Sequence, residues 1–281
     1  MERSRWKLSK KNNFENFSKE HIAFLKKIKK EEKFISIFQI SLFLLFLFVW
    51  ELAVRFCLID SFVASSSYEV VKTFINLHKS NQLWNNIFIT FFEVLVTFLL
   101  GSFLGVLISI FLWWFKVFEK VCRPYLIILN ALPKIALGPM IIVWVGAGMK
   151  SIIVMSLLIS VINVIINVTL GFKKVDRNKI LLMKTFGASK MQILKNVVLP
   201  INIPNIMSTL KINIGMSLIG VITGEFLVSK GGIGYLIVYG GQTFKINLII
   251  TGIAALSLLA LFFYFAINKI EKYVNNCIYK F

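Results

Sequence analysis

The chain has 281 residues, of which 57% are hydrophobic and only 16% charged, and it carries a net charge of +19. Soluble domains average about 45–50% apolar and about 25% charged residues. The composition therefore excludes an ordinary soluble domain and predicts a protein that crosses a membrane several times. On a soluble protein this charge would suggest nucleic acid as a partner, but here the positions of the basic residues give it another cause.

The first 33 residues are basic and rich in Asn and Lys. They are too long for a signal-peptide n-region, and the apolar run after them is long enough to span a bilayer, with no small-residue cleavage site. We expect residues 1–33 to be a retained cytoplasmic tail.

Six apolar segments follow this tail, each close to the roughly 20 residues that a helix needs to cross a bilayer. The third is interrupted by Pro133 and by Gly138-Pro139. The sequence predicts an all-α polytopic membrane protein in which residues 34–281 form a single domain. The predicted spans cover about residues 34–54, 87–114, 125–145, 151–172, 201–226 and 246–269.

Lysine and arginine are concentrated in the tail, in the loops after the second and fourth spans and at the C-terminal end. Basic loops stay in the cytoplasm, so we expect both termini and residues 176–200 to be cytoplasmic. This topology accounts for most of the positive charge, and nucleic acid is not an expected partner.

Some residues inside the predicted spans are small or polar. Gly101 with Gly105, and Gly220 with Gly224, stand four apart. Such pairs let helix backbones approach closely, and we interpret both as packing positions. Ionisable residues in spans are costly and are functional candidates. The sequence leaves open whether these polar residues line a pathway or bind neighbouring helices.

Sites for catalysis or cofactors are not apparent in the sequence. It contains no Walker A loop, HExxH or GxSxG motif, and its three cysteines are scattered. We therefore expect no enzymatic activity, no bound metal and no cofactor.

Residues 176–200 contain "MKTFGASKMQILKNVVLP". Gly187 interrupts this stretch, and Pro200 is expected to end its helix. An amphipathic helix of this kind can bury its apolar stripe in a groove on another protein. The stripe recurs at close to helical spacing, at Met183, Met191, Leu194 and Val198.

This stretch resembles the coupling motif of ABC importer membrane subunits, the binding-protein-dependent permeases. The family pattern is Glu-Ala-Ala, three residues, Gly, nine residues and Ile-x-Leu-Pro. The chain has Gly187 and, after nine residues, "VVLP" ending at Pro200, with Leu181-Leu182-Met183 in place of Glu-Ala-Ala. "LPKIALGPMIIVWVGAGMKS" and "GEFLVSKGGIGYLI" are similar to parts of the nitrate/sulfonate/taurine permease subfamily.

The resemblance implies a type I ABC importer permease (MetI-like) fold with six transmembrane helices and a cytoplasmic coupling helix, in a bacterial plasma membrane. It implies as partners two ATPase subunits, which bind ATP and Mg themselves, an extracellular substrate-binding protein and a second, identical permease subunit. The implied ATPase-coupling residues are Met183, Gly187, Ala188, Met191, Leu194, Val198, Leu199 and Pro200. The candidate pathway or gating residues are Pro133, Asn163, Asn167, Lys211, Glu225, Gly232 and Gly234.

An ion-coupled secondary transporter is the alternative. Such proteins often bind their ion at broken helices in repeated halves. The interrupted third span fits this class, but no matching interruption appears in the second half apart from Pro204.

Overall fold

A computed structural model describes residues 19–56 and 65–278, and in these ranges all regular structure is helical. By its contacts the chain divides into two units, residues 1–67 and 68–281. In the first unit, α2 (Lys19–Arg55) is one helix that contains the first predicted span, residues 34–54. At 1.5 Å per residue it is about 55 Å long, more than a bilayer core requires.

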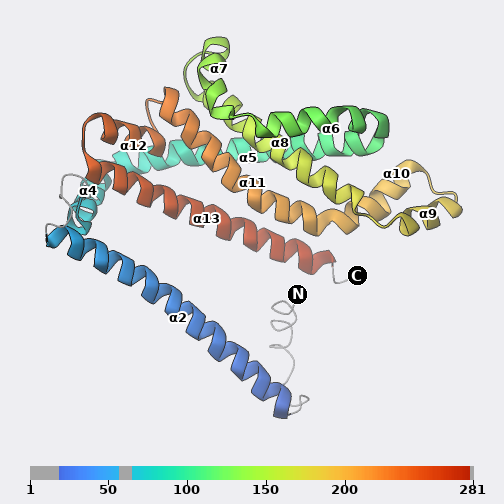
Figure 1. Ribbon diagram of the computed structural model, residues 1–281, viewed down its shortest axis with the longest axis horizontal. Coiled ribbons are helices and arrows are strands. Elements are labelled where there is room, and N and C mark those ends of the chain that lie inside the picture. Colours follow the sequence, from blue (N-terminus) through green and yellow to red (C-terminus); the bar gives the residue numbers. More distant parts are fainter. Residues whose placement is uncertain (1–18, 57–64, 279–281) are drawn as a thin grey trace. The chain divides into compact units, whose positions relative to one another are not determined.

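The second unit is a bundle of long helices joined by short helices and turns (Figure 1). Its first half contains α4 (Ser67–Lys79), α5 (Gln82–Trp114), α6 (Lys116–Ala131), the 3₁₀ turn η2 (Lys134–Leu137), α7 (Gly138–Val145) and α8 (Met149–Lys173). Its second half contains α9 (Arg177–Thr185), α10 (Lys190–Ile193), the π-helical turn η3 (Leu194–Val198), α11 (Leu199–Val228), α12 (Ile233–Gln242) and α13 (Ile246–Ile278).

In the described part of the chain, four helical segments are long and apolar enough to cross a membrane. They are Gln82–Trp114, Met149–Lys173, Lys190–Val228 and Ile246–Val274. A fifth candidate is a pair of helices bent by 87°, Lys116–Ala131 with Lys134–Val145. The predicted all-helical membrane fold is confirmed to this extent.

The bend in the third predicted span lies at Pro133, between α6 and η2. Proline lacks an N–H, and the residue before it is disfavoured in helical geometry. Leu132 accordingly adopts an extended conformation, with ψ 137°. Pro139 lies in the first turn of α7, where the missing N–H costs nothing. The predicted interruption is therefore confirmed, and the segment turns sharply instead of running straight.

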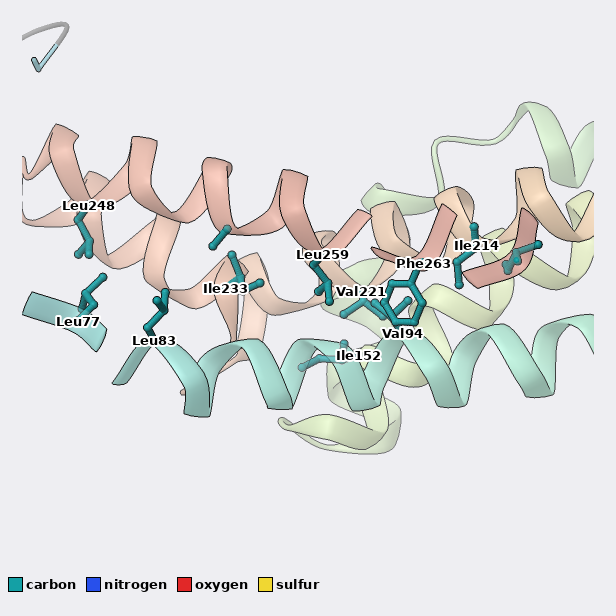
Figure 2. Packing of buried hydrophobic residues seen from close by; sticks show 12 residues of the cluster. Leu77, Leu83, Val94, Ile152, Ile214, Val221, Ile233, Leu248, Leu259 and Phe263 are labelled. Carbon is teal, nitrogen blue, oxygen red and sulfur yellow. The ribbon is translucent and has the colours of Figure 1, made fainter. Parts of the chain in front are cut away.

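The larger apolar core lies between α5, α11, α12 and α13 (Figure 2). Val94 and Val221 are fully buried there, and Phe91 stacks on Phe263 with 5.1 Å between ring centroids. This core therefore holds the two long C-terminal helical elements against α5.

Helix α8 packs tightly against α5 on one side and α11 on the other, through the four paired glycines. A Cβ at Gly101 would lie 2.0 Å from Ser160 Oγ, and one at Gly220 would lie 2.6 Å from Ser156 Cα. A Cβ at Gly105 would lie 2.6 Å from Val164, and one at Gly224 would lie 3.0 Å from Ile152, both on α8. Because these distances leave no room for a side chain, the predicted role of both pairs in helix packing is confirmed.

Candidate functional site

The predicted coupling segment is a helical turn at one end of α8 and α11 (Figure 1). Asp176 caps the N-terminus of α9, and its side chain accepts the Asn178 N–H at 2.9 Å. The helix ends in a Schellman motif: Gly187 N–H donates to Lys184 O at 2.9 Å, and Ala188 N–H donates to Met183 O at 3.0 Å. Gly187 has φ +74°, a conformation that glycine adopts without strain.

The next helix starts two residues later with a capping box. Ser189 Oγ accepts the Gln192 N–H at 3.3 Å, and Gln192 Oε1 accepts the Ser189 N–H at 2.7 Å. The sequence GASKMQ thus closes one helix and opens the next within a few residues. Both ends of the turn are fixed by local hydrogen bonds, so the turn has a defined shape without a partner.

The apolar stripe of this segment is divided between two environments. Leu194 and Val198 are 4% and 0% exposed and pack with Val164, Val168 and Phe172 of α8. Ala188, Leu199 and Met183 lie at the edge of the same cluster. The expectation that the whole stripe faces another protein is therefore wrong, because the chain's own α8 covers its C-terminal half.

The exposed apolar surface of the turn is formed by other residues. Met191 is 60% exposed, and Phe186, which the sequence interpretation did not select, is 78% exposed. Leu181 and Leu182, which stand in the place of Glu-Ala-Ala, are also more than half exposed. We call Leu181, Leu182, Phe186 and Met191 the turn patch. The sequence already pointed to the position of Phe186, because this residue directly precedes Gly187, where α9 ends and the chain turns.

Pro200 does not end the helix as expected. The helical segment continues from Lys190 to Val228, and Pro200 lies in the first turn of α11. The π-helical turn η3 directly precedes it. A proline clashes with the carbonyl four residues earlier in a regular α-helix, and the wider π turn provides room at that carbonyl. The proline therefore marks a local widening, and α10 continues through η3 into α11.

At the other end of α11, three of the candidate pathway residues come together. Glu225 is 1% exposed, and one of its carboxylate oxygens accepts the Gly234 N–H at the start of α12. A Cβ at Gly232, which has φ +104°, would lie 2.3 Å from Glu225 Oε1. Glycine is needed at this position both for its backbone conformation and for the space that the carboxylate occupies.

Helix α5 supplies the other hydrogen-bond acceptors for the start of α12. Asn86 Oδ1 accepts the Gly232 N–H at 2.7 Å, and Thr90 Oγ1 accepts the Ile233 N–H at 2.8 Å. Thr90 also donates to Glu225 Oε1 at 2.6 Å. The first N–H groups of a helix have no partner within it, and here side chains of α5 and α11 satisfy them. This network fixes α12 to both long helices. The sequence interpretation missed Asn86 and Thr90.

The two asparagines of α8 are hydrogen-bonded to each other, and one of them contacts α11. Asn167 donates to Asn163 Oδ1 at 3.0 Å, and its backbone oxygen accepts from Asn205 Nδ2 at 3.3 Å. Among the described residues, the buried Nδ2 of Asn163 has no hydrogen-bond partner. Asn167 therefore takes part in helix–helix binding, whereas Asn163 keeps an unsatisfied donor.

The two remaining candidates lie apart from these clusters. Lys211 of α11 forms an ion pair with Glu271 of α13, with side chains 26% and 16% exposed. Pro133 lies at the bend between α6 and η2. The sequence left open whether Lys211 lines a pathway or binds a neighbouring helix. The structure shows the second arrangement, with Lys211 paired to α13.

Comparisons with known proteins agree with this arrangement. The family described as "Binding-protein-dependent transport system inner membrane component" matches residues 98–276. We call Glu225, Gly232, Gly234, Asn86 and Thr90 the Glu225 cluster. The matched range includes the turn patch and the first three residues of this cluster. A "Probable ABC transporter permease protein" of Haemophilus influenzae is 31% identical over 186 residues, covering 66% of this chain and 76% of the relative.

Two further relatives carry more specific names. The formylaminopyrimidine transport permease protein ThiX of Halalkalibacterium halodurans is 27% identical over 82% of this chain and 91% of its own length. The putative aliphatic sulfonates transport permease protein SsuC of Bacillus subtilis is 27% identical over 73% and 74% of the two chains.

A solved structure has the same fold. One chain of the MetNI methionine ABC transporter, in an inward-facing conformation, superposes with a TM-score of 0.57 at 20% identity, covering 69% of this chain and 95% of that one. Family and fold together favour the ABC permease over the secondary transporter. This chain therefore belongs to the binding-protein-dependent transport system inner membrane components, the permeases of ABC importers.

Proposed function

We propose that this chain forms the transmembrane pathway of an importer for a small solute and that its turn patch docks on a separate ATPase subunit. The observation that supports docking most directly is the turn patch itself, an apolar surface on a turn whose two ends are capped locally. Exposed apolar patches mark sites of protein interaction. Helices of this kind bind partners by inserting apolar side chains into a groove.

Motion of the turn would be transmitted along α11. The buried Leu194 and Val198 attach the turn to α8, and the uninterrupted segment Lys190–Val228 reaches the Glu225 cluster at its far end. A rigid helix that is held at both ends moves as one body. Closure of the ATPase would thus reposition α11 and α12 together. We place Asn163, with its unsatisfied amide, and the bend at Pro133 along the solute pathway.

The complete assembly that we propose has six spans per permease chain, with both termini in the cytoplasm, and a second, identical permease subunit. Two ATPase subunits on the cytoplasmic side would bind ATP and Mg, and an extracellular binding protein would deliver the solute. Relatives named for aliphatic sulfonates, taurine, formylaminopyrimidine and riboflavin indicate a sulfonate-like solute or a vitamin precursor.

Docking can be tested with two exposed phenylalanines. Phe186 in the turn patch is 78% exposed, and Phe244 between α12 and α13 is 72% exposed. We expect Phe186→Asp to lower co-purification of the cognate ATPase at least about tenfold, as loss of a hot-spot aromatic commonly does. Phe244→Asp is the matched control and should leave it unchanged. Equal co-purification with both variants would contradict docking at the turn patch.

Topology needs a separate measurement. In a chain whose native cysteines have been replaced, Lys184→Cys lies on the turn and Lys245→Cys lies between α12 and α13. A membrane-impermeant maleimide added to intact cells should label only the Lys245→Cys variant. Labelling of the Lys184→Cys variant from outside would put the turn beyond the reach of any cytoplasmic ATPase.

A further inference from the structure

A pocket of about 590 Å³ opens at the corner where α5 ends and α6 begins. Residues of both helices line it, and Lys190 from α10 completes one side. The pocket is therefore adjacent to the turn patch but distinct from it, and neither the Glu225 cluster nor the docking proposal involves it. Its volume is within the roughly 300–1,000 Å³ of ordinary ligand sites.

The wall of the pocket is mostly apolar and aromatic. Phe111 packs against Phe115 and Phe118, with ring centroids 4.8 and 5.4 Å away. Each of these rings is 48% exposed, and Val121 continues the wall at 55%. Clustered aromatic rings of this kind form a rigid apolar surface that can pack against a hydrocarbon chain.

Two positive charges border this apolar wall. Lys116 belongs to the first turn of α6, and Lys190 Nζ donates to the backbone oxygen of Trp114 and lies 5.0 Å from the centroid of its ring. Among the described residues, no acidic side chain lines the pocket. The nearby acid of α6, Glu119, is instead paired with Arg123 and Lys173. No acid among the residues that line the pocket therefore neutralises the charges of Lys116 and Lys190.

The position of the pocket along α5 indicates its depth in the membrane. Trp113 and Trp114 end this long apolar helix, and their rings meet edge to face at 6.3 Å. Tryptophans gather at the headgroup level of a bilayer, while lysines next to them reach toward the phosphates. A pocket at this level, with an apolar aromatic wall and two lysines in its lining, matches the two halves of an anionic lipid.

We propose that this pocket binds one anionic phospholipid, with its phosphate between Lys116 and Lys190 and an acyl chain along the wall of Phe111, Phe115, Phe118 and Val121. Because Lys190 begins α10, the bound lipid would connect the turn to the membrane surface. On the proposed topology, with the turn in the cytoplasm, this lipid belongs to the cytoplasmic leaflet. The pocket and its lysines do not depend on that topology. Binding can therefore be measured without the ATPase.

The test uses the purified full-length chain in nanodiscs that contain phosphatidylglycerol and phosphatidylcholine at equal amounts. Native mass spectrometry after release from the nanodisc counts the phosphatidylglycerol molecules that stay bound. One lysine near an anionic lipid surface changes affinity by about fivefold. We expect Lys116→Gln and Lys190→Gln each to weaken retention by about this factor, and the double variant by about 30-fold.

Two further variants separate this site from general lipid attraction. Lys120→Gln removes an exposed lysine of α6 that does not line the pocket, and it should leave retention unchanged. Val121→Trp fills the apolar wall while keeping both lysines, and it should also weaken retention.

Three results would overturn the proposal. They are equal losses in the Lys116→Gln and Lys120→Gln variants, retention of phosphatidylcholine as strong as that of phosphatidylglycerol, and efficient cross-linking of two Val117→Cys chains through the pocket wall. The last result would mean that a second copy covers the wall. If instead the unmodified chain retains no phosphatidylglycerol but still co-purifies with the ATPase, the lipid site alone is refuted and the proposed function stands.

Discussion

The close packing of α8 against α11 makes one glycine substitution especially informative. In the Gly220→Ala variant, the new Cβ would lie 2.6 Å from Ser156 Cα and 2.7 Å from Ser156 Cβ. Carbon atoms pack best at about 3.5–4.0 Å, so the overlap is on the order of 1 Å. One of the two atoms is backbone, and no side-chain rotation can remove this clash. The two helices would have to separate.

The same helix contains a matched control. A Cβ at Gly215 would meet nothing within 4 Å, so Gly215→Ala changes only helix propensity and should stabilise by up to about 1 kcal/mol. Gly220→Ala gains the same propensity but adds the cost of overpacking, about 1–3 kcal/mol. We expect the Gly220→Ala variant to be less stable than the Gly215→Ala variant by about 1–3 kcal/mol.

Thermal unfolding of the full-length chain in one detergent measures this difference. For domains somewhat smaller than this chain, 1 kcal/mol corresponds to roughly 2–4 °C in Tm. The Tm of the Gly220→Ala variant should therefore lie several degrees below that of the Gly215→Ala variant. If the two variants unfold at the same temperature, or if the Gly220→Ala variant is the more stable, the tight α8–α11 contact does not exist in the protein.

Three further predictions concern single contacts. Thr90→Val leaves the Ile233 N–H without an acceptor, at a cost of about 1–3 kcal/mol. Hydrogen exchange in this variant should therefore become faster in α12 than in α8, and an equal change in both helices would contradict the prediction. Lys211→Gln and Glu271→Gln should each lower the stability of the chain, measured by thermal unfolding. The charge-swapped Lys211→Glu/Glu271→Lys double variant should recover part of this loss, whereas strictly additive effects would mean that the pair is not formed. Gly187→Ala forces a side chain into the left-handed region at about 1–2 kcal/mol, so ATPase co-purification should fall more than in the Gly187→Asn variant, because Asn tolerates this region better.

Much of the helical bundle could be predicted from the sequence because lipid imposes simple rules. The long apolar runs, the interruption at Pro133 and the paired glycines all reflect backbone requirements that a single residue type reveals. The sharpness of the bend at Pro133 could not be predicted, because packing against neighbouring elements determines the angle.

The Glu225 cluster was only partly predictable. Glu225, Gly232 and Gly234 were selected through the family resemblance, but Thr90, which donates to Glu225, and Asn86, which accepts from Gly232, lie more than a hundred residues away, on α5. A signal for α5 was nevertheless present. Asn86, Thr90 and Thr97 lie on its buried face together with Gly101, and this small and polar stripe has helical spacing. In a membrane helix, such a stripe marks the face that binds other helices.

The error about the apolar stripe of the coupling segment shows why helical spacing alone cannot identify a docking surface. Leu194 and Val198 have the same chemistry and spacing as Met191, yet the first two are buried in the chain's own core and the third is exposed. A turn that transmits force needs both kinds of contact. An apolar turn that faced only the partner would bend away from α8 under load, and one that faced only α8 would have nothing to bind. The division of one stripe between the core and the turn patch therefore fits the docking role that we propose for the turn. It also predicts that Leu194→Ala acts on stability, by about 2–5 kcal/mol, whereas Phe186→Asp acts on ATPase binding.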